Sequence, residues 1–393
     1  MDSGHVAVVG GGGTGAALAH DLVLRGLRVT LLERGELTSG TTGRHHGLLH
    51  SGARYAVADA ESAVECIQEN RILRRIAPGS FEENGGLFVA LTDEDMDYRP
   101  GFVDACAACG IPARELTTAE ALRLEPGLNP AIKAAVWVPD ATMDAMRLPL
   151  RFFATARRNG AKLHPFTEVV GLLGRGGVVS GVAVHDHLAG RDAEIPADLV
   201  VNATGPWCER LAAMAGAEVP VRPSPGVLLA LRGRLCDLVV NRLHPAGDGD
   251  IVLPQRGLSV VGTSAWVVTD PDDLEVPEEH VQAMYREGAR LVPAVASAAT
   301  RAAWSAARPL VGAAGGASSG RQLSRTFKCF DHAVSDGVEG FVTITGGKAT
   351  TLRAMAEAAA DVVCAKLGLE APCRTREVVL EPHTAHYTGG RAA

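Results

Sequence analysis

The sequence predicts an α/β protein in which a parallel-sheet domain is interleaved with a second domain built on a mixed sheet. Near the N-terminus the β-branched run Val6–Val9 is followed by a glycine-rich turn and an apolar helical stretch, which is the order of a βαβ unit. Near the C-terminus the strand-like run Phe341–Ile344 is again followed by a glycine pair that opens a helical stretch. Strands from both ends of the chain are therefore expected in one domain, and the stretches between them in the other.

Composition and length exclude several classes of protein. The 393 residues carry a net charge of −7 with no basic half, so the electrostatic footprint of a nucleic-acid-binding protein is missing. No apolar run approaches the roughly 18 residues of a membrane-spanning helix, and the first residues lack the basic start of a signal peptide. The eight cysteines are scattered and are expected to be reduced thiols. We expect a cytoplasmic protein, with peripheral contact to a membrane left open.

The first glycine-rich turn has the spacing of a Rossmann-like phosphate-binding motif. Gly10, Gly12 and Gly15 form G-x-G-x-x-G. The first glycine allows a tight turn, the second lets a pyrophosphate approach the backbone, and the third lets helix and strand pack closely. The second strand-like run, Arg28–Leu32, ends at Glu33, about 20 residues beyond the glycines. A carboxylate at that position binds the ribose hydroxyls of an adenine dinucleotide.

A long polar loop decides between FAD and NAD. Residues 35–55 read GELTSGTTGRHHGLLHSGARY, without a further strand–helix repeat, and loops of this length are usually functional. This run resembles the FAD-dependent glycerol-3-phosphate dehydrogenases, in particular the catalytic subunit of the anaerobic bacterial enzyme. The resemblance covers about residues 5–375 and continues through residues 84–88, 138–142, 201–207, 308–310 and 343–348.

The resemblance implies an FAD-binding domain of the D-amino-acid-oxidase/glutathione-reductase type with an interleaved substrate domain. Residues 1–80, 145–215 and 301–380 are assigned to the FAD-binding domain, and residues 81–144 and 216–300 to the substrate-binding cap. The polar tail, residues 381–393, is expected to be disordered. The chain ends where the anaerobic relatives continue into a cysteine-rich iron–sulfur module that would take electrons from the flavin. We expect this module to be missing. A quinone, oxygen or a partner protein is left open as the electron acceptor.

Three parts of the chain are expected to bind FAD. Small residues after the buried strand Leu199–Val201 permit close approach to a flat ligand, and a glycine pair at a helix N-terminus stabilises the negative charge of the reduced flavin. The predicted cofactor-binding residues are Gly10, Gly12, Gly13, Thr14, Gly15, Glu33, Arg34, Thr41, Thr42, Gly43, His45, His46, Leu48, Val169, Ala203, Thr204, Gly205, Trp207, Gly346, Gly347 and Lys348.

The substrate side needs a fixed positive charge if the substrate is a phosphorylated alcohol. Arginine suits a phosphate because its planar fork binds bidentately and stays charged. Arg54 and Arg308 occupy the substrate-side arginine positions that the resemblance implies, Tyr55 lies beside the first, and Lys348 lies next to the flavin. These four are the predicted substrate-binding residues. Arg54, Arg308 and Lys348 are also predicted to be catalytic.

The proton acceptor is predicted to be His50, since an imidazole titrates near neutral pH. A plain hydrogen-bonding role for His50 and a second histidine, His332, are the alternatives. Three positions depart from the family pattern. Val227 stands where membrane-bound relatives carry a histidine, Leu352 where the pattern has a tyrosine, and His45 where it has an asparagine. His45 either links covalently to the flavin or only forms hydrogen bonds, and the departures leave the exact phosphorylated or anionic alcohol open.

Two further functions are compatible with these residues. One is an FAD-dependent L-2-hydroxy-acid or amine oxidase, in which the two arginines would bind a carboxylate. The other is a non-catalytic FAD-binding subunit. The C-x-x-C pair Cys106 and Cys109 and the pair His185 and His187 lack further ligands nearby in sequence, so no metal site is predicted.

Overall fold

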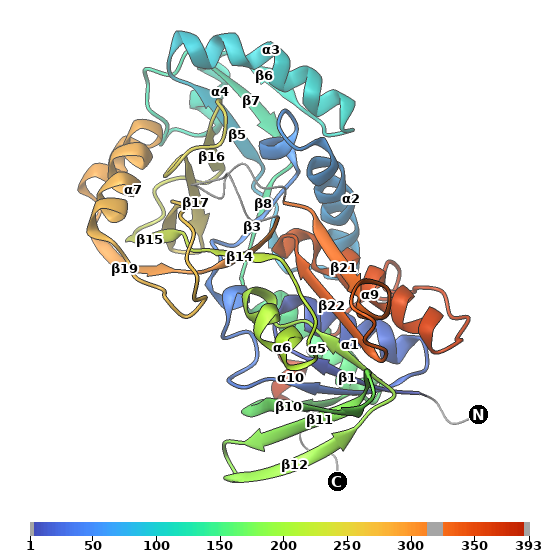
Figure 1. Cartoon of the computed structure of the whole chain (residues 1–393). Coiled ribbons are helices and arrows are strands. Elements are labelled where there is room, and N and C mark those ends of the chain that lie inside the picture. Colours follow the sequence, from blue (N-terminus) through green and yellow to red (C-terminus); the bar gives the residue numbers. More distant parts are fainter. Residues whose placement is uncertain (1–3, 313–324, 389–393) are drawn as a thin grey trace.

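The computed structural model describes residues 4–312 and 325–388. Its two largest sheets occupy different halves of the molecule, with the six-stranded sheet in the lower half of Figure 1 and the eight-stranded sheet in the upper half. Between them lie small sheets and loops that belong to neither half. The functional site is built where these parts meet.

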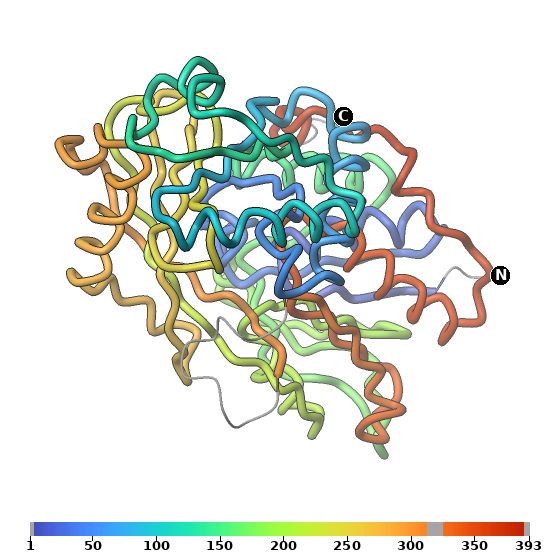
Figure 2. The backbone as a smooth tube through the Cα atoms, turned by 90° about the horizontal axis from the view of Figure 1, so that it is seen from above, coloured from blue at the N-terminus to red at the C-terminus, as the bar shows by residue number. Residues whose placement is uncertain are grey.

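The six-stranded sheet combines strands from the beginning, middle and end of the chain. Its order is β21-β22-β13-β1-β2-β9, and all neighbours are parallel except β21 and β22. The strands are β1 (His5–Val9), β2 (Arg28–Leu32), β9 (Lys162–His164), β13 (Leu199–Asn202), β21 (Phe327–Asp331) and β22 (Phe341–Gly346). The expectation that both ends of the chain contribute to one sheet is confirmed, and Figure 2 shows blue, green and red segments side by side in this half.

Both faces of this sheet are covered. Helices α1 (Gly13–Leu24), α5 (Arg147–Arg158) and α9 (Leu352–Lys366) pack together on one face, where Leu18, Leu31 and Phe152 are fully buried. The other face is covered by α6 (Cys208–Met214) and by an antiparallel sheet of β10 (Thr167–Arg175), β11 (Val178–Asp186) and β12 (Arg191–Pro196). Because both faces are buried, the central strands are continuous apolar runs rather than alternating ones.

The eight-stranded sheet is mixed, as predicted. Its order is β19-β15-β18-β17-β16-β5-β7-β6, with one parallel pair, β16 and β5. The strands are β5 (Gly86–Ala90), β6 (Arg114–Leu116), β7 (Ala134–Val138), β15 (Val227–Arg232), β16 (Val239–Arg242), β17 (Ile251–Gln255), β18 (Leu258–Gly262) and β19 (Thr300–Ser305). Helices α3 (Asp93–Ala108), α4 (Thr118–Leu124) and α7 (Glu278–Leu291) pack against it (Figure 1).

The expected domain boundary after residue 300 is wrong by a few residues. Strand β19 pairs with β15 in the eight-stranded sheet, from Leu231 opposite Thr300 to Val227 opposite Ser305. After α7 the chain reaches the open edge of β15 and pairs with this strand as β19. It then returns to the half of the molecule that contains the six-stranded sheet. The returning strand β20 (Arg308–Val311) then pairs with β14 (Val221–Ser224).

The remaining elements connect the two halves. Helix α2 (Ala60–Ile76) packs beside a small sheet of β3 (Leu48–Leu49), β4 (Phe81–Glu82) and β8 (Ala141–Met143), and α8 (His332–Ser335) follows β21. Within the tail that was expected to be disordered, a short helix, α10 (Ala385–Thr388), packs on α5, where Arg157 donates to the Ala385 carbonyl. Residues 389–393 of that tail lie outside the described residues. In the described ranges, no helix has the length and apolarity needed to cross a bilayer.

Candidate functional site

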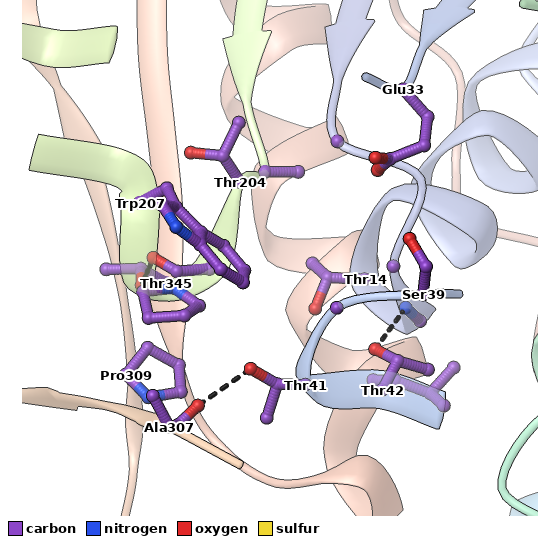
Figure 3. A pocket seen from close by; sticks show the side chains of 18 of the residues that line it. Thr14, Glu33, Ser39, Thr41, Thr42, Thr204, Trp207, Ala307, Pro309 and Thr345 are labelled. Carbon is purple, nitrogen blue, oxygen red and sulfur yellow. Dashed lines mark hydrogen bonds between the residues drawn. The ribbon is translucent and has the colours of Figure 1, made fainter. Parts of the chain in front are cut away.

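A cavity of about 490 Å³ opens at the carboxyl ends of the parallel strands β1, β2, β13 and β22. This edge is where doubly wound sheets bind their ligands. We call this cavity the cofactor cavity, because residues predicted from the sequence to bind the cofactor line it. Figure 3 shows Glu33 on one side of this cavity, Thr204 and Trp207 on the other, and Thr41 and Thr42 along a third side.

The glycine motif shapes the floor of the cofactor cavity. Gly10 has φ +113°, and a Cβ there would lie 2.5 Å from the Ala203 carbonyl oxygen. A Cβ on Gly15 would lie 1.9 Å from the Gly10 carbonyl oxygen, so this glycine lets helix α1 cross close to β1. Gly12 lines the cavity and caps α1 without a side-chain hydrogen bond. Thr42 Oγ1 accepts from the Gly13 N–H, and the rest of the first turn of α1 faces the cavity, where it can bind an anionic group.

Glu33 is held at the edge of the cofactor cavity by two backbone groups. Its Oε2 accepts from the Gly11 N–H at 2.7 Å, and its Oε1 accepts from the Gly35 N–H at 2.9 Å. These bonds hold the carboxylate of Glu33 in the cavity wall. This placement suits the ribose-binding role predicted from its position after β2.

The polar loop of residues 35–55 lies across the cavity. Thr42 Oγ1 accepts from the Gly13 N–H at 2.9 Å, and Thr41 Oγ1 donates to the Ala307 carbonyl at 2.7 Å (Figure 3). The loop therefore connects helix α1 with the chain that leads into β20. A Cβ on Gly43 would lie 2.6 Å from the Thr38 carbonyl oxygen, so this glycine is needed for the turn itself.

The cavity fits the cofactor that the sequence predicts. A glycine cradle, a helix N-terminus and a fixed carboxylate lie along one site, which matches the diphosphate and ribose of FAD. Of the predicted cofactor residues, Gly15 and Gly43 line no described cavity, while His46 and Leu48 line the second cavity described below. The others line the cofactor cavity.

A second cavity, of about 540 Å³, joins the first and faces the cap. Both cavities are lined by Thr41, His45, Arg308, Gly347 and Lys348. We call the second one the substrate cavity.

Among the residues that the structure describes, four cationic side chains line the substrate cavity. Three of them, Arg54, Arg308 and Lys348, were predicted from the sequence, and the fourth, Arg325, was missed. Arg325 lies two residues before β21, far from the motifs that carried the prediction, and only the antiparallel pairing of β21 with β22 brings it beside Lys348. No local sequence signal marks it.

Arg308 is held by neutral groups. Its guanidinium donates to the carbonyls of Ser224, Pro225 and Ser264 at 2.8–3.0 Å and to the Thr263 hydroxyl at 3.1 Å. No carboxylate within the described residues forms an ion pair with it. Burial, with Arg325 nearby, lowers the pKa of Arg308 to about 9. A bound anion would supply the charge that the protein leaves unbalanced here.

Arg54 and Lys348 differ from Arg308 because each has a carboxylate partner. Arg54 Nη2 lies 2.6 Å from Asp250 Oδ1. Lys348 Nζ lies 3.5 Å from Glu65 Oε2, donates to the Arg325 carbonyl at 2.8 Å and sits 5.2 Å from the centre of the Tyr55 ring. The positive charges of these two residues are partly balanced before any ligand binds.

Three histidines of the polar loop, His45, His46 and His50, line the substrate cavity. The rings of His46 and His50 are 5.8 Å apart, and those of His50 and Tyr55 are 5.3 Å apart. Burial lowers the pKa of His45 to about 4 and of His46 to about 3, and it lowers the pKa of His50 well below 6.5. All three imidazoles are therefore neutral at pH 7, and His45 Nδ1 accepts from the Gly47 N–H at 2.9 Å.

The alternative base His332 is not in the site. It is fully buried beside β22, where its Nδ1 lies 2.7 Å from Asp336 Oδ2 and its Nε2 lies 2.8 Å from Thr343 Oγ1. Of the other departures from the family pattern, Leu352 lines the cofactor cavity, whereas Val227 lines neither cavity and is fully buried.

The minor sequence features lie away from both cavities. Cys106 and Cys109 are free, buried thiols on or next to α3. His185 and His187 lie at an exposed hairpin, opposite Asp192 and Glu168. In the part of the chain that the structure describes, no cluster of three or more histidine, cysteine or acidic side chains is arranged to hold a metal ion.

The family model for FAD dependent oxidoreductases (DAO) matches residues 5–361. The chain belongs to this family. It is 44% identical over 380 residues to the A-subunit of the anaerobic glycerol-3-phosphate dehydrogenase of Escherichia coli K12, covering 96% of this chain and 70% of the relative. It is 45% identical over 395 residues to the A1-subunit of the same enzyme of Haloferax volcanii, covering 98% and 67%. The chain is thus an FAD-dependent oxidoreductase of the group that contains these A-subunits.

Solved structures show the same fold. The glycerol-3-phosphate dehydrogenase from Bacillus halodurans complexed with FAD matches with a TM-score of 0.73 and 23% identity, over 96% of this chain and 68% of that one. Glycine oxidase from Geobacillus kaustophilus matches with a TM-score of 0.74 and 23% identity, over 95% and 97%. At this identity the likeness concerns the fold, which is the D-amino-acid-oxidase type predicted from the sequence.

Proposed function

We propose that this protein oxidises the secondary alcohol of sn-glycerol 3-phosphate, or of a closely related phosphorylated alcohol, to a ketone. The observation that carries the proposal is the group of four cations in the substrate cavity, one of which, Arg308, has no carboxylate partner within the described residues. The names of the relatives support the same substrate.

The phosphate is proposed to bind at Arg308 and Arg325. A guanidinium that is held only by neutral groups keeps its full charge for a ligand, and the fork geometry of arginine matches phosphate oxygens. Arg308 lines both cavities, so a substrate anchored there extends toward the cofactor. Arg54 and Lys348, whose charges are partly balanced, are left for the hydroxyl groups.

FAD, when bound, supplies the two-electron acceptor that takes the hydride from the carbinol carbon. His50 is the proposed acceptor of the hydroxyl proton. It lines the substrate cavity, and its imidazole is neutral at pH 7 because burial lowers its pKa. Its backbone N–H donates to Thr350 Oγ1 at 3.1 Å, which fixes the loop that carries the ring. Lys348, at the junction of the cavities, supplies positive charge beside the reacting oxygen.

A carboxylate substrate is the second candidate, because the same cations would bind an L-2-hydroxy acid. The charge count favours phosphate. A phosphate monoester carries up to two negative charges on one group at pH 7, which can balance Arg308 and Arg325 together, whereas a single carboxylate group carries one negative charge and leaves one of these cations unbalanced.

The test is anaerobic reduction of the bound flavin. Holoenzyme mixed with glycerol 3-phosphate without oxygen should lose its flavin absorbance band, while 2-hydroxyglutarate, glycine and unphosphorylated glycerol leave it unchanged at equal concentration. Bleaching by 2-hydroxyglutarate or an amine alone would replace the substrate class. No bleaching by any alcohol or amine, with unaltered flavin binding in Arg308→Ala, would indicate a non-catalytic FAD-binding subunit.

A further inference from the structure

A buried carboxylate behind the substrate cavity holds Arg54. Asp250, the residue before β17, lines neither cavity, but its Oδ1 lies 2.6 Å from Arg54 Nη2. The Arg54 side chain is 10% exposed and the Asp250 side chain 3% exposed. Burial acts to raise the pKa of Asp250, but Arg54 and His244 beside it bring the pKa below its usual value, so the carboxylate stays charged.

The same carboxylate fixes a loop of the cap. Its Oδ2 accepts from the Gly247 N–H at 2.7 Å and lies 3.3 Å from His244 Nε2. Arg54 Nη2 in turn donates to the Gly247 carbonyl at 3.4 Å. Within the loop of residues 243–250, Pro245 and Ala246 line the substrate cavity. One carboxylate therefore connects an arginine of the cavity with a wall of the same cavity.

We propose that Asp250 is a positioning residue that sets substrate affinity through Arg54, which it holds against the 243–250 loop, without touching the substrate. This inference rests on the proposed function in one respect, that Arg54 binds the substrate. The charge of Arg54 is already balanced by Asp250, so the contribution of this pair is orientation, while Arg308 carries the charge. A side chain that is locked in place by its supporting contacts loses less entropy when it binds a ligand.

The first measurement is the steady-state kinetics of the Asp250→Asn holoenzyme with glycerol 3-phosphate. We expect KM to rise about tenfold, kcat to change less than threefold, and the flavin content and absorbance spectrum to stay as in the wild type, because Asp250 lies outside the cofactor cavity. Arg54→Ala and the Asp250→Asn/Arg54→Ala double variant complete a double-mutant cycle. If Asp250 acts through Arg54, the double variant has the KM of Arg54→Ala within twofold.

The matched control is Asp95→Asn. Asp95 is equally buried, pairs with Arg242 at 3.1 Å and lines neither cavity. It should lower the melting temperature without changing KM. Asp250→Glu keeps the charge and shifts the carboxylate, and it should raise KM about threefold. It replaces Asp250→Asn in the test if that variant does not yield folded protein. A KM within twofold of wild type in a folded Asp250 variant, or effects that multiply in the double variant, would overturn the proposal.

The outcome can be separated from that of the proposed function. If glycerol 3-phosphate does not bleach the wild-type flavin, the substrate assignment fails. The wild type, Asp250→Asn, Arg54→Ala and the double variant are then titrated with glycerol 3-phosphate as a ligand, whose hydroxyl groups are proposed to lie at Arg54, while the flavin spectrum is followed. Weaker binding in Asp250→Asn, with no further loss in the Arg54→Ala background, would still support the positioning role. Equal affinity in wild type and Asp250→Asn, or no binding to either, would refute it.

Discussion

Arg308 shows how much of the site depends on a single residue. Its guanidinium makes four hydrogen bonds, to three carbonyls and a hydroxyl, and still lines both cavities. Arg308→Lys keeps a positive charge but cannot make these bonds together, since an ammonium is a point charge and not a fork. We expect KM for glycerol 3-phosphate to rise about 100-fold, or ~3 kcal/mol, in steady-state assays. The control is Arg210→Lys, because Arg210 forms an exposed ion pair with Asp272 and its substitution should leave KM unchanged. An unchanged KM in Arg308→Lys would contradict phosphate binding at Arg308.

His20 is a residue whose effect concerns stability rather than activity. It is fully buried in α1 against Phe152, and neither ring nitrogen has a hydrogen-bond partner within the described residues. Burial lowers its pKa from 6.5 to about 4. The unfolded chain therefore binds a proton that the native state does not, so native stability falls as the pH drops from 6.5 toward 4.

The substitution His20→Leu tests this account. The penalty from His20 reaches about 2 kcal/mol at pH 5, so the variant should gain roughly that much over wild type at pH 5 and less at pH 7. Urea unfolding at the two pH values measures the difference. His187→Leu, at an exposed position, provides the control and should show no such gain. A His20→Leu variant with the wild-type pH dependence would show that His20 does not titrate as described.

At the scale of the element, the βαβ unit depends on the close crossing of α1 and β1. A Cβ on Gly15 would lie 1.9 Å from the Gly10 carbonyl oxygen, which is backbone and cannot move aside cheaply. Gly15→Ala should therefore displace the first turn of α1 and weaken FAD binding at least tenfold, measured by flavin fluorescence titration. Gly101→Ala in α3, where a Cβ meets nothing within 4 Å, should leave FAD affinity unchanged and add up to ~1 kcal/mol of stability. Wild-type FAD affinity in Gly15→Ala would rule out this packing role.

The same scale shows what could be predicted from the sequence. Four strands of the six-stranded sheet, β1, β2, β13 and β22, were predictable because strands buried on both faces are apolar runs followed by turns of small residues, as at Val6–Val9 and Phe341–Ile344. The edge strands β9 and β21 are short or partly exposed and were not predicted. Strand β19 was assigned to the wrong half because its pairing with β15 is decided by an open sheet edge, which leaves no mark on its own sequence. Arg325 and Asp250 were missed for a related reason. Their roles come from strands and loops that meet only in the folded protein.

At the scale of the whole molecule, neither half can form the site alone. The cofactor cavity is built mainly on the six-stranded sheet, while Asp272 and Leu274, from the stretch between β18 and α7, also line it. The substrate cavity combines the polar loop with Pro245, Ala246 and Ile251 of the cap. The two halves can share both cavities because the chain passes between them several times. Each passage brings a segment of one half to the edge of the other half.

The segment between β18 and α7, residues 263–277, makes the contact that bears most directly on the cofactor. Asp272 accepts from Trp207 Nε1 at 2.9 Å and pairs with Arg34 at 3.1 Å and Arg210 at 2.7 Å. Arg34 follows Glu33 in the chain and its guanidinium lies 4.8 Å from the centre of the Trp207 ring, so these groups join the Glu33 side of the cavity to the Trp207 side. The segment therefore bridges the cap and the cofactor half across this part of the cavity.

Opening of this bridge should limit the release of FAD. Each exposed ion pair contributes little, but Asp272 joins three partners, and their combined loss should amount to about 1 kcal/mol. We expect Asp272→Asn to accelerate FAD dissociation roughly five- to tenfold in a stopped-flow measurement of flavin fluorescence, and the wild-type rate to approach that of the variant as salt is raised, since salt screens exposed charges. KM for glycerol 3-phosphate should not change, because Asp272 does not line the substrate cavity. Asp273→Asn, next along the chain and outside both cavity linings, is the matched control. Equal, salt-independent dissociation rates in all three proteins would mean that the bridge stays closed while FAD leaves by another route.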